Sequence, residues 1–106
     1  MNENLQGTLA QLRGGFERLY GGRLAGMFLY GSRARGDQEP DSDVDVLVVL
    51  KGPVHPGEEI ARTGEFLASL CLKNNNVVSC VFLSEERLQM ERSPLLLNVR
   101  MEGVAI

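Results

Sequence analysis

Residues 43–50 decide the fold of this chain, and they read DVDVLVVL. Residues 46–50 are apolar without any polar alternation, which is typical of a strand covered on both faces. Side chains two apart on a strand share a face, so Asp43 and Asp45 project the same way, while the valine that follows each of them points into the core. The stretch therefore predicts a central strand that carries two carboxylates where it begins.

The segment before this strand predicts a turn suited to phosphate. Residues 25–30 form a short apolar and partly aromatic run, which indicates a buried strand ending at Gly31. Ser32 offers an N-cap for a brief helical turn through Arg35, which leaves backbone N–H groups pointing outward at the positive end of a helix dipole. Phosphate binds at such a turn, and Arg33 and Arg35 add complementary charge.

The two aspartates together indicate a metal site. Like charges side by side repel, and each raises the pKa of the other unless a cation lies between them. Carboxylate oxygens combined with substrate phosphates suit Mg²⁺, for which Mn²⁺ can substitute. If the two strands pair antiparallel, the glycine turn faces the carboxylates. A plainer interpretation makes Asp41, Ser42 and Asp43 loop caps, but it does not explain why Asp45 lies inside a strand.

The rest of the chain alternates helices and strands. Residues 5–19 predict an amphipathic helix that ends at two glycines, with its core face formed by Leu5, Leu9, Leu12, Phe16 and Leu19. A second helix is expected from residue 58 to an asparagine run at 74–76, with a face formed by Ile60, Phe66, Leu67, Leu70 and Cys71.

The C-terminal part predicts one more strand and more helix. Residues 77–83 are β-branched and aromatic, Ser84 caps a helix, and Pro94 restarts it to about residue 101. A strand, a crossover helix and the next strand normally form a right-handed parallel unit. We therefore expect a mixed α/β fold with a small sheet of about three strands flanked by helices, in one domain spanning residues 1–106.

The composition of the chain argues against several functional classes of protein. Lys and Arg number 11 against 14 Asp and Glu, a net charge of −3, which argues against a surface that grips nucleic acid. No apolar run approaches the roughly 20 residues that cross a bilayer, and residues 1–6 show no secretory signal, so a cytoplasmic location is expected. Cys71 and Cys80 predict core thiols, and His55 predicts an exposed loop residue.

Gly31-Ser32, a spacer of about ten residues and Asp43-Val44-Asp45 on a strand resemble the minimal nucleotidyltransferases of the DNA polymerase beta superfamily. The order of helices and strands matches along nearly the whole chain. The resemblance implies transfer of a nucleoside monophosphate from a Mg²⁺-bound nucleoside triphosphate, ATP being expected, to a hydroxyl. Asp43 and Asp45 would hold metal and act in catalysis, and the phosphate would bind Gly31, Ser32, Arg33 and Arg35.

The chain departs from the family at one position. The family usually carries a third carboxylate early on the third strand, where this chain has Ser79. Without that acid, a second metal ion binds weakly and the attacking group lacks a general base, a loss of about two to four orders of magnitude in rate. The candidate substitutes for this acid are Asp41 in the spacer and Glu85 and Glu86 downstream.

The family resemblance also implies a partner. Minimal nucleotidyltransferases are commonly paired with an all-helical HEPN protein in toxin–antitoxin systems, where the small chain is the antitoxin and in some systems transfers AMP to a partner tyrosine. Two hypotheses follow: an enzyme that modifies a hydroxyl on such a partner, or a catalytically impaired module that binds nucleotide and partner and blocks the partner sterically. The sequence leaves homo-oligomerisation open.

Overall fold

The computed structural model describes residues 3–31 and 43–106. The helical turn expected at residues 32–35 lies outside these ranges. The described elements are, in chain order, α1 (Glu3–Tyr20), the short 3₁₀ helix η1 (Gly21–Arg23), β1 (Leu24–Tyr30), β2 (Val44–Leu50), α3 (Pro56–Asn74), β3 (Val78–Ser84), α4 (Glu85–Met90), α5 (Pro94–Glu102) and β4 (Val104–Ala105). Among these elements, no helix is both long and apolar enough to span a bilayer.

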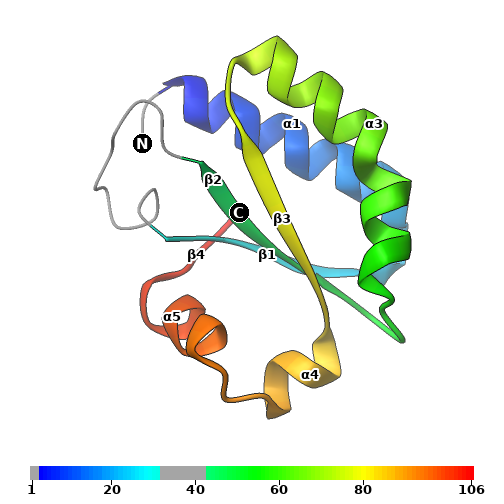
Figure 1. Ribbon diagram of the computed structural model, residues 1–106, viewed down its shortest axis with the longest axis vertical. Helices are drawn as coiled ribbons and strands as arrows, with labels where there is room; N and C mark the ends of the chain where they lie inside the picture. The colour runs from blue at the N-terminus through cyan, green and yellow to red at the C-terminus, as the bar shows by residue number, and fades with distance from the viewer. Residues whose placement is uncertain (1–2, 32–42) are drawn as a thin grey trace.

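The strands form one mixed sheet in the order β3-β2-β1-β4 (Figure 1). β2 and β3 are parallel through the α3 crossover, which confirms the expected pairing, and β1 and β2 are antiparallel, which is the condition under which the glycine turn faces the carboxylates. The sequence analysis expected about three strands, and the structure adds a fourth. β4 is only two residues long and pairs with the outer side of β1.

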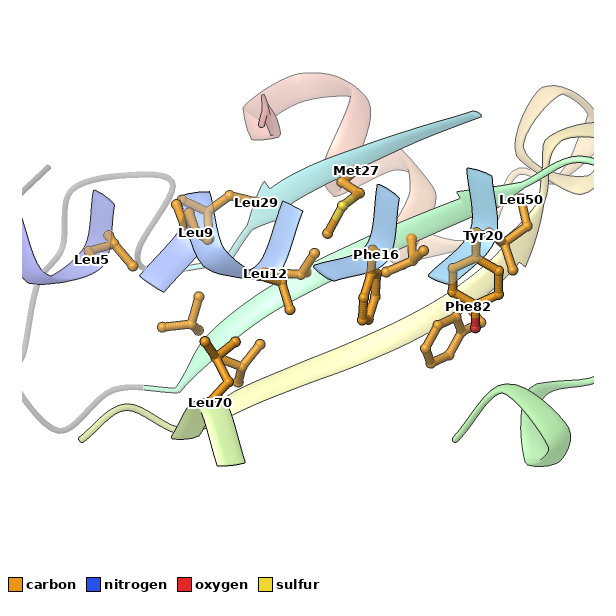
Figure 2. Packing of buried hydrophobic residues seen from close by; sticks show 14 residues of the cluster. Leu5, Leu9, Leu12, Phe16, Tyr20, Met27, Leu29, Leu50, Leu70 and Phe82 are labelled. Atoms are coloured by element: carbon orange, nitrogen blue, oxygen red, sulfur yellow. The ribbon is translucent and has the colours of Figure 1, made fainter. Parts of the chain in front are cut away.

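Helices cover both faces of the sheet, as the unbroken apolar run in β2 predicted. α1 and α3 lie side by side on one face, and α4 and α5 lie on the other (Figure 1). Alternate residues of β2 enter two separate cores. Val44, Val46, Val48 and Leu50 pack under α1 and α3, in the cluster shown in Figure 2, whereas Leu47 and Val49 pack with Leu83, Leu96 and Val99 on the opposite face.

The core face of α1 ends one residue later than expected. Leu19 is 44% exposed, so its predicted place in the core is wrong, and Tyr20 takes that place. The ring of Tyr20 packs edge-on against Phe16, while its hydroxyl donates a hydrogen bond of 2.7 Å to Oε1 of Glu59 (Figure 2 shows the ring). Tyr20 fills the core and also gives a buried acid a partner, which Leu19 cannot do.

The core face of α3 differs from the prediction at one residue, Ile60, whereas Phe66, Leu67, Leu70 and Cys71 pack in or against the core as expected. Ile60 is 59% exposed, whereas Glu59 and Thr63 are buried. The Thr63 hydroxyl donates to the Glu59 carbonyl oxygen at 2.8 Å, and Arg62 donates to the Glu59 carboxylate at 2.8 Å. Polar groups can occupy this face because each of them has a partner. Leu70 is buried as expected, and Asn75 caps the helix in the left-handed conformation.

Candidate active site

The strand register brings three polar side chains into one row across the sheet. Asp45 on β2 pairs with Tyr30 on β1 and with Ser79 on β3. Paired residues on neighbouring strands share a face, and Asp45 shares that of Leu47, so the row lies on the α4/α5 side. Asp43 immediately precedes β2, two residues before Asp45, and is exposed, whereas Asp45 is half-buried. The two carboxylates therefore lie together where β2 begins, with Asp45 in the middle of the row.

Gly31 lies directly against one of these carboxylates. It has a φ of +75°, which residues with a Cβ rarely adopt, and a Cβ at this position would lie 2.8 Å from Oδ2 of Asp45. Two independent reasons, backbone conformation and space, thus require glycine here. The end of β1 and the start of β2 face each other, so the antiparallel pairing brings the glycine beside the acidic pair.

Negative charge is concentrated in the row, as in sites that bind a cation. Burial raises the pKa of Asp45 above its ordinary value, and the negative charge of Asp43 raises it further. Burial and then the charge of Asp45 raise the pKa of Tyr30, with a smaller contribution from Cys80. A divalent cation would relieve the repulsion between the two aspartates, and two hard carboxylate oxygens suit Mg²⁺.

The residues present fit a metal held jointly with a substrate rather than by the protein alone. In the described ranges, no group of three or more His, Cys, Asp or Glu side chains is arranged to hold a metal ion. The third position next to the pair, directly across from Asp45, is the neutral Ser79. Mg²⁺ commonly takes one or two carboxylates and completes its shell with water and substrate phosphates.

Two acids considered as substitutes for the third carboxylate lie at the wrong end of β3. Glu85 and Glu86 begin α4 directly after Ser84, which pairs with Leu50 at the far end of β2. Asp45 pairs near the start of the same strands. A substitution from α4 is therefore wrong on topological grounds. The other candidate, Asp41, lies outside the described residues.

Three of the predicted phosphate-binding residues, Ser32, Arg33 and Arg35, also lie outside the described ranges, and their roles stay predictions. Tyr30 was not singled out from the sequence, although its position directly before Gly31 was a signal. Its place beside Asp45 depends on the register between β1 and β2, which the sequence alone did not define.

The two cysteines pack against the core and the histidine is exposed, as the sequence predicted. Cys71 and Cys80 are partly buried and pack against the core beneath α1 and α3. Burial and the neighbouring Cys71 raise the pKa of Cys80 to about 12, so this thiol stays protonated and unreactive. His55 is exposed and immediately precedes α3, where its side chain makes no capping hydrogen bond.

Comparisons with known proteins identify the family and the fold of the chain. A family model described as a nucleotidyltransferase domain matches residues 9–97. No curated protein matches the chain. Among solved structures, a toxin–antitoxin complex with AMP-PNP is similar at a TM-score of 0.64 and 20% identity, covering 91% of this chain and 69% of that one.

Two further solved structures share the fold. A putative nucleotidyltransferase from Sulfolobus solfataricus has a TM-score of 0.59 and 20% identity, covering 99% of this chain and 86% of that one. A complex of a tri-AMPylated Shewanella oneidensis HEPN toxin with an MNT antitoxin has a TM-score of 0.54 and 16% identity, covering 92% of this chain and 70% of that one. At such identities, these likenesses establish the fold.

Proposed function

Because the chain belongs to the nucleotidyltransferase domain family, we propose that it transfers a nucleoside monophosphate from a metal-bound nucleoside triphosphate to a hydroxyl acceptor. One observation carries this proposal. The carboxylate of Asp45 lies against Gly31, at the turn where phosphate is expected, with Asp43 two residues away. ATP is the expected donor, and a cytoplasmic single-domain protein spanning residues 1–106 would have access to it.

Asp43 and Asp45 would hold Mg²⁺, with Mn²⁺ as a substitute. Bound by these two carboxylates, the ion would neutralise negative charge on the triphosphate. Because Gly31 has no Cβ, the Asp45 carboxylate can lie against it, and the positive φ of Gly31 turns the backbone at the end of β1. Ser32, Arg33 and Arg35 would bind the phosphates, an assignment that rests on the sequence pattern.

The acceptor hydroxyl would belong to a HEPN-type partner protein, with this chain as the antitoxin. The support is the likeness to an MNT antitoxin in complex with an AMPylated HEPN toxin. The acidic composition agrees, since a net charge of −3 gives no direct nucleic-acid footprint.

A second function is favoured by one observation, the serine across from Asp45. Where a third carboxylate would complete the site, Ser79 supplies no negative charge. The chain would then bind a metal–nucleotide complex and a partner without turnover, and would inhibit the partner sterically.

Incubation with α-labelled ATP, Mg²⁺ and a co-purified or co-expressed HEPN-type protein separates the two functions. For the enzyme, we expect label on the partner that is lost in Asp43→Asn and retained in Glu65→Gln, an exposed acid on α3 away from the site. Partner binding without label, in the presence of bound nucleotide, would support the steric module. Absence of both nucleotide binding and label would refute both functions.

A further inference from the structure

We propose that Ser79 is a self-modification site, whose hydroxyl accepts a nucleoside monophosphate from the triphosphate bound by the same chain. This inference rests on the proposed nucleotidyl-transfer function and extends it to a residue of the protein itself. The strand register pairs Ser79 with Asp45, at the position where the family resemblance implies an acid.

The geometry of the sheet places Ser79 close to the carboxylate that would hold the metal–nucleotide complex. Ser79 and Asp45 are direct partners on parallel strands, which lie about 4.8 Å apart, and paired side chains point to the same face. Ser79 is exposed, so its hydroxyl is accessible to a bound nucleotide. The residues two before and two after it, Val77 and Val81, share its face and carry no nucleophile.

The other hydroxyl in the row is less available. Tyr30 pairs with Asp45 from the opposite side, but it is half-buried and packs against the cluster that contains Leu47 and Leu96. Within the row formed by Tyr30, Asp45 and Ser79, the serine is therefore the side chain that combines a hydroxyl with exposure.

A hydroxyl that the protein holds beside the bound nucleotide reacts faster than a hydroxyl compound free in solution. Loss of general-base assistance slows attack by about 10²- to 10⁴-fold. The effective concentration of a well-oriented intramolecular nucleophile reaches about 10⁵ to 10⁸ M, which is enough to offset that loss. A site too impaired to modify a dissolved hydroxyl compound rapidly can therefore still modify its own serine.

The reaction balances without an additional reagent. Oγ of Ser79 forms a bond to the α-phosphorus, the bond from this phosphorus to the oxygen bridging to the β-phosphate breaks, and pyrophosphate leaves. The serine proton passes to water. The product is a phosphodiester with one negative charge beside Asp45, where like-charge repulsion and bulk oppose binding of a second triphosphate, so each chain reacts once.

Mass spectrometry of the intact chain after incubation with ATP and Mg²⁺ tests this proposal. We expect a gain of one AMP group, mapped by peptide sequencing to Ser79. The gain should be lost in Ser79→Ala and Asp43→Asn, and should persist in Ser79→Thr, which keeps a hydroxyl, and in Ser69→Ala, an exposed serine on α3. An adduct that survives Ser79→Ala, or that maps to Ser32 or Ser42, would overturn the proposal.

A second measurement tests whether position 79 lies beside the bound nucleotide, without requiring nucleotidyl transfer. In Ser79→Cys, bound AMP-PNP and Mg²⁺ should slow alkylation of the introduced thiol by iodoacetamide at least tenfold, whereas alkylation of a thiol introduced by Ser69→Cys, at an exposed position on α3, should stay unchanged. If calorimetry detects AMP-PNP binding but the wild-type chain gains no AMP group from ATP, the self-modification alone is overturned. The same holds if bound AMP-PNP does not protect the thiol introduced at position 79. Failure of AMP-PNP to bind at all would overturn the proposed function and this inference with it.

Discussion

Gly31 and Asp45 approach each other so closely that a Cβ on the glycine would lie 2.8 Å from Oδ2 of the aspartate. This contact joins the end of β1 to the start of β2. It places a turn with positive φ, which side chains disfavour, next to a carboxylate whose pKa is raised by burial and by Asp43. The absence of a Cβ on Gly31 is what allows the Asp45 carboxylate to lie against the backbone at the end of β1.

Gly31→Ala should therefore damage both stability and binding. The left-handed conformation costs a residue with a Cβ about 1–2 kcal/mol, and the new methyl group displaces the Asp45 carboxylate. We expect a lower midpoint in thermal unfolding and weaker binding of AMP-PNP. Gly64→Ala is the matched control: its Cβ would meet nothing within 4 Å, and it lies inside α3, so it should stabilise the protein by about 0.5–1 kcal/mol. Equal effects of the two substitutions would contradict this account.

Ser79→Asp should restore a third acid beside Asp45. Without metal, an added negative charge next to two aspartates should lower the unfolding temperature. With Mn²⁺ and AMP-PNP, the same charge should raise that temperature above the wild-type value and strengthen metal binding in calorimetry. Ser69→Asp, an exposed change on α3, should show neither effect. If Ser79→Asp leaves metal affinity unchanged, Ser79 does not occupy the position of the missing acid.

The stability of the protein should depend on pH through Asp45. Its pKa is higher in the folded than in the unfolded chain, so the folded state holds the proton more tightly. Stability is then lost as pH rises from the unfolded pKa, about 3.9, through the folded one. Asp45→Asn should unfold at a higher temperature than the wild type at pH 7, and the difference should shrink toward pH 4. A variant less stable than the wild type at pH 7 would contradict this prediction.

The buried acid of α3 should matter to stability rather than to activity. Glu59 is 2% exposed and accepts hydrogen bonds from Tyr20 and Arg62, and burial together with Glu59 raises the pKa of Tyr20 above its ordinary range. Tyr20→Phe removes one bond to a charged group and should cost about 1–3 kcal/mol in urea unfolding, with AMP-PNP affinity unchanged.

The control for that change is Glu17→Gln, which breaks the exposed Arg13–Glu17 pair and should cost less than about 0.5 kcal/mol. If Tyr20→Phe is as harmless as Glu17→Gln, the buried hydrogen bond does not stabilise the junction between α1 and α3.

The sequence predicted the elements whose patterns are unambiguous. A continuous apolar run placed β2 at the centre, and the crossover through α3 required a parallel β3. Helical periodicity defines a face only to within a residue, so the choice of Leu19 over Tyr20 was wrong. β4 is too short to show alternation; it is positioned by contacts distant in sequence, such as the hydrogen bond from the Ile106 N–H to the Met27 carbonyl oxygen at 3.0 Å.

Part of the candidate site could likewise be predicted from local sequence patterns, and part could not. Strand periodicity alone puts Asp43 and Asp45 on one face. The approach of Gly31 and the row formed with Tyr30 and Ser79 depend on strand register, which follows from packing on both sides of the sheet rather than from local pattern. Family resemblance, not periodicity, pointed to Ser79 as the position of the missing acid.

Calorimetric titration of AMP-PNP in Mg²⁺ tests most directly whether the two aspartates hold a metal–nucleotide complex. We predict measurable binding to the wild type and to Glu65→Gln, its loss when EDTA replaces Mg²⁺, and at least a tenfold loss of affinity in Asp43→Asn and in Asp45→Asn. Binding that survives the removal of both carboxylates, or no binding by the wild-type chain, would contradict the central claim.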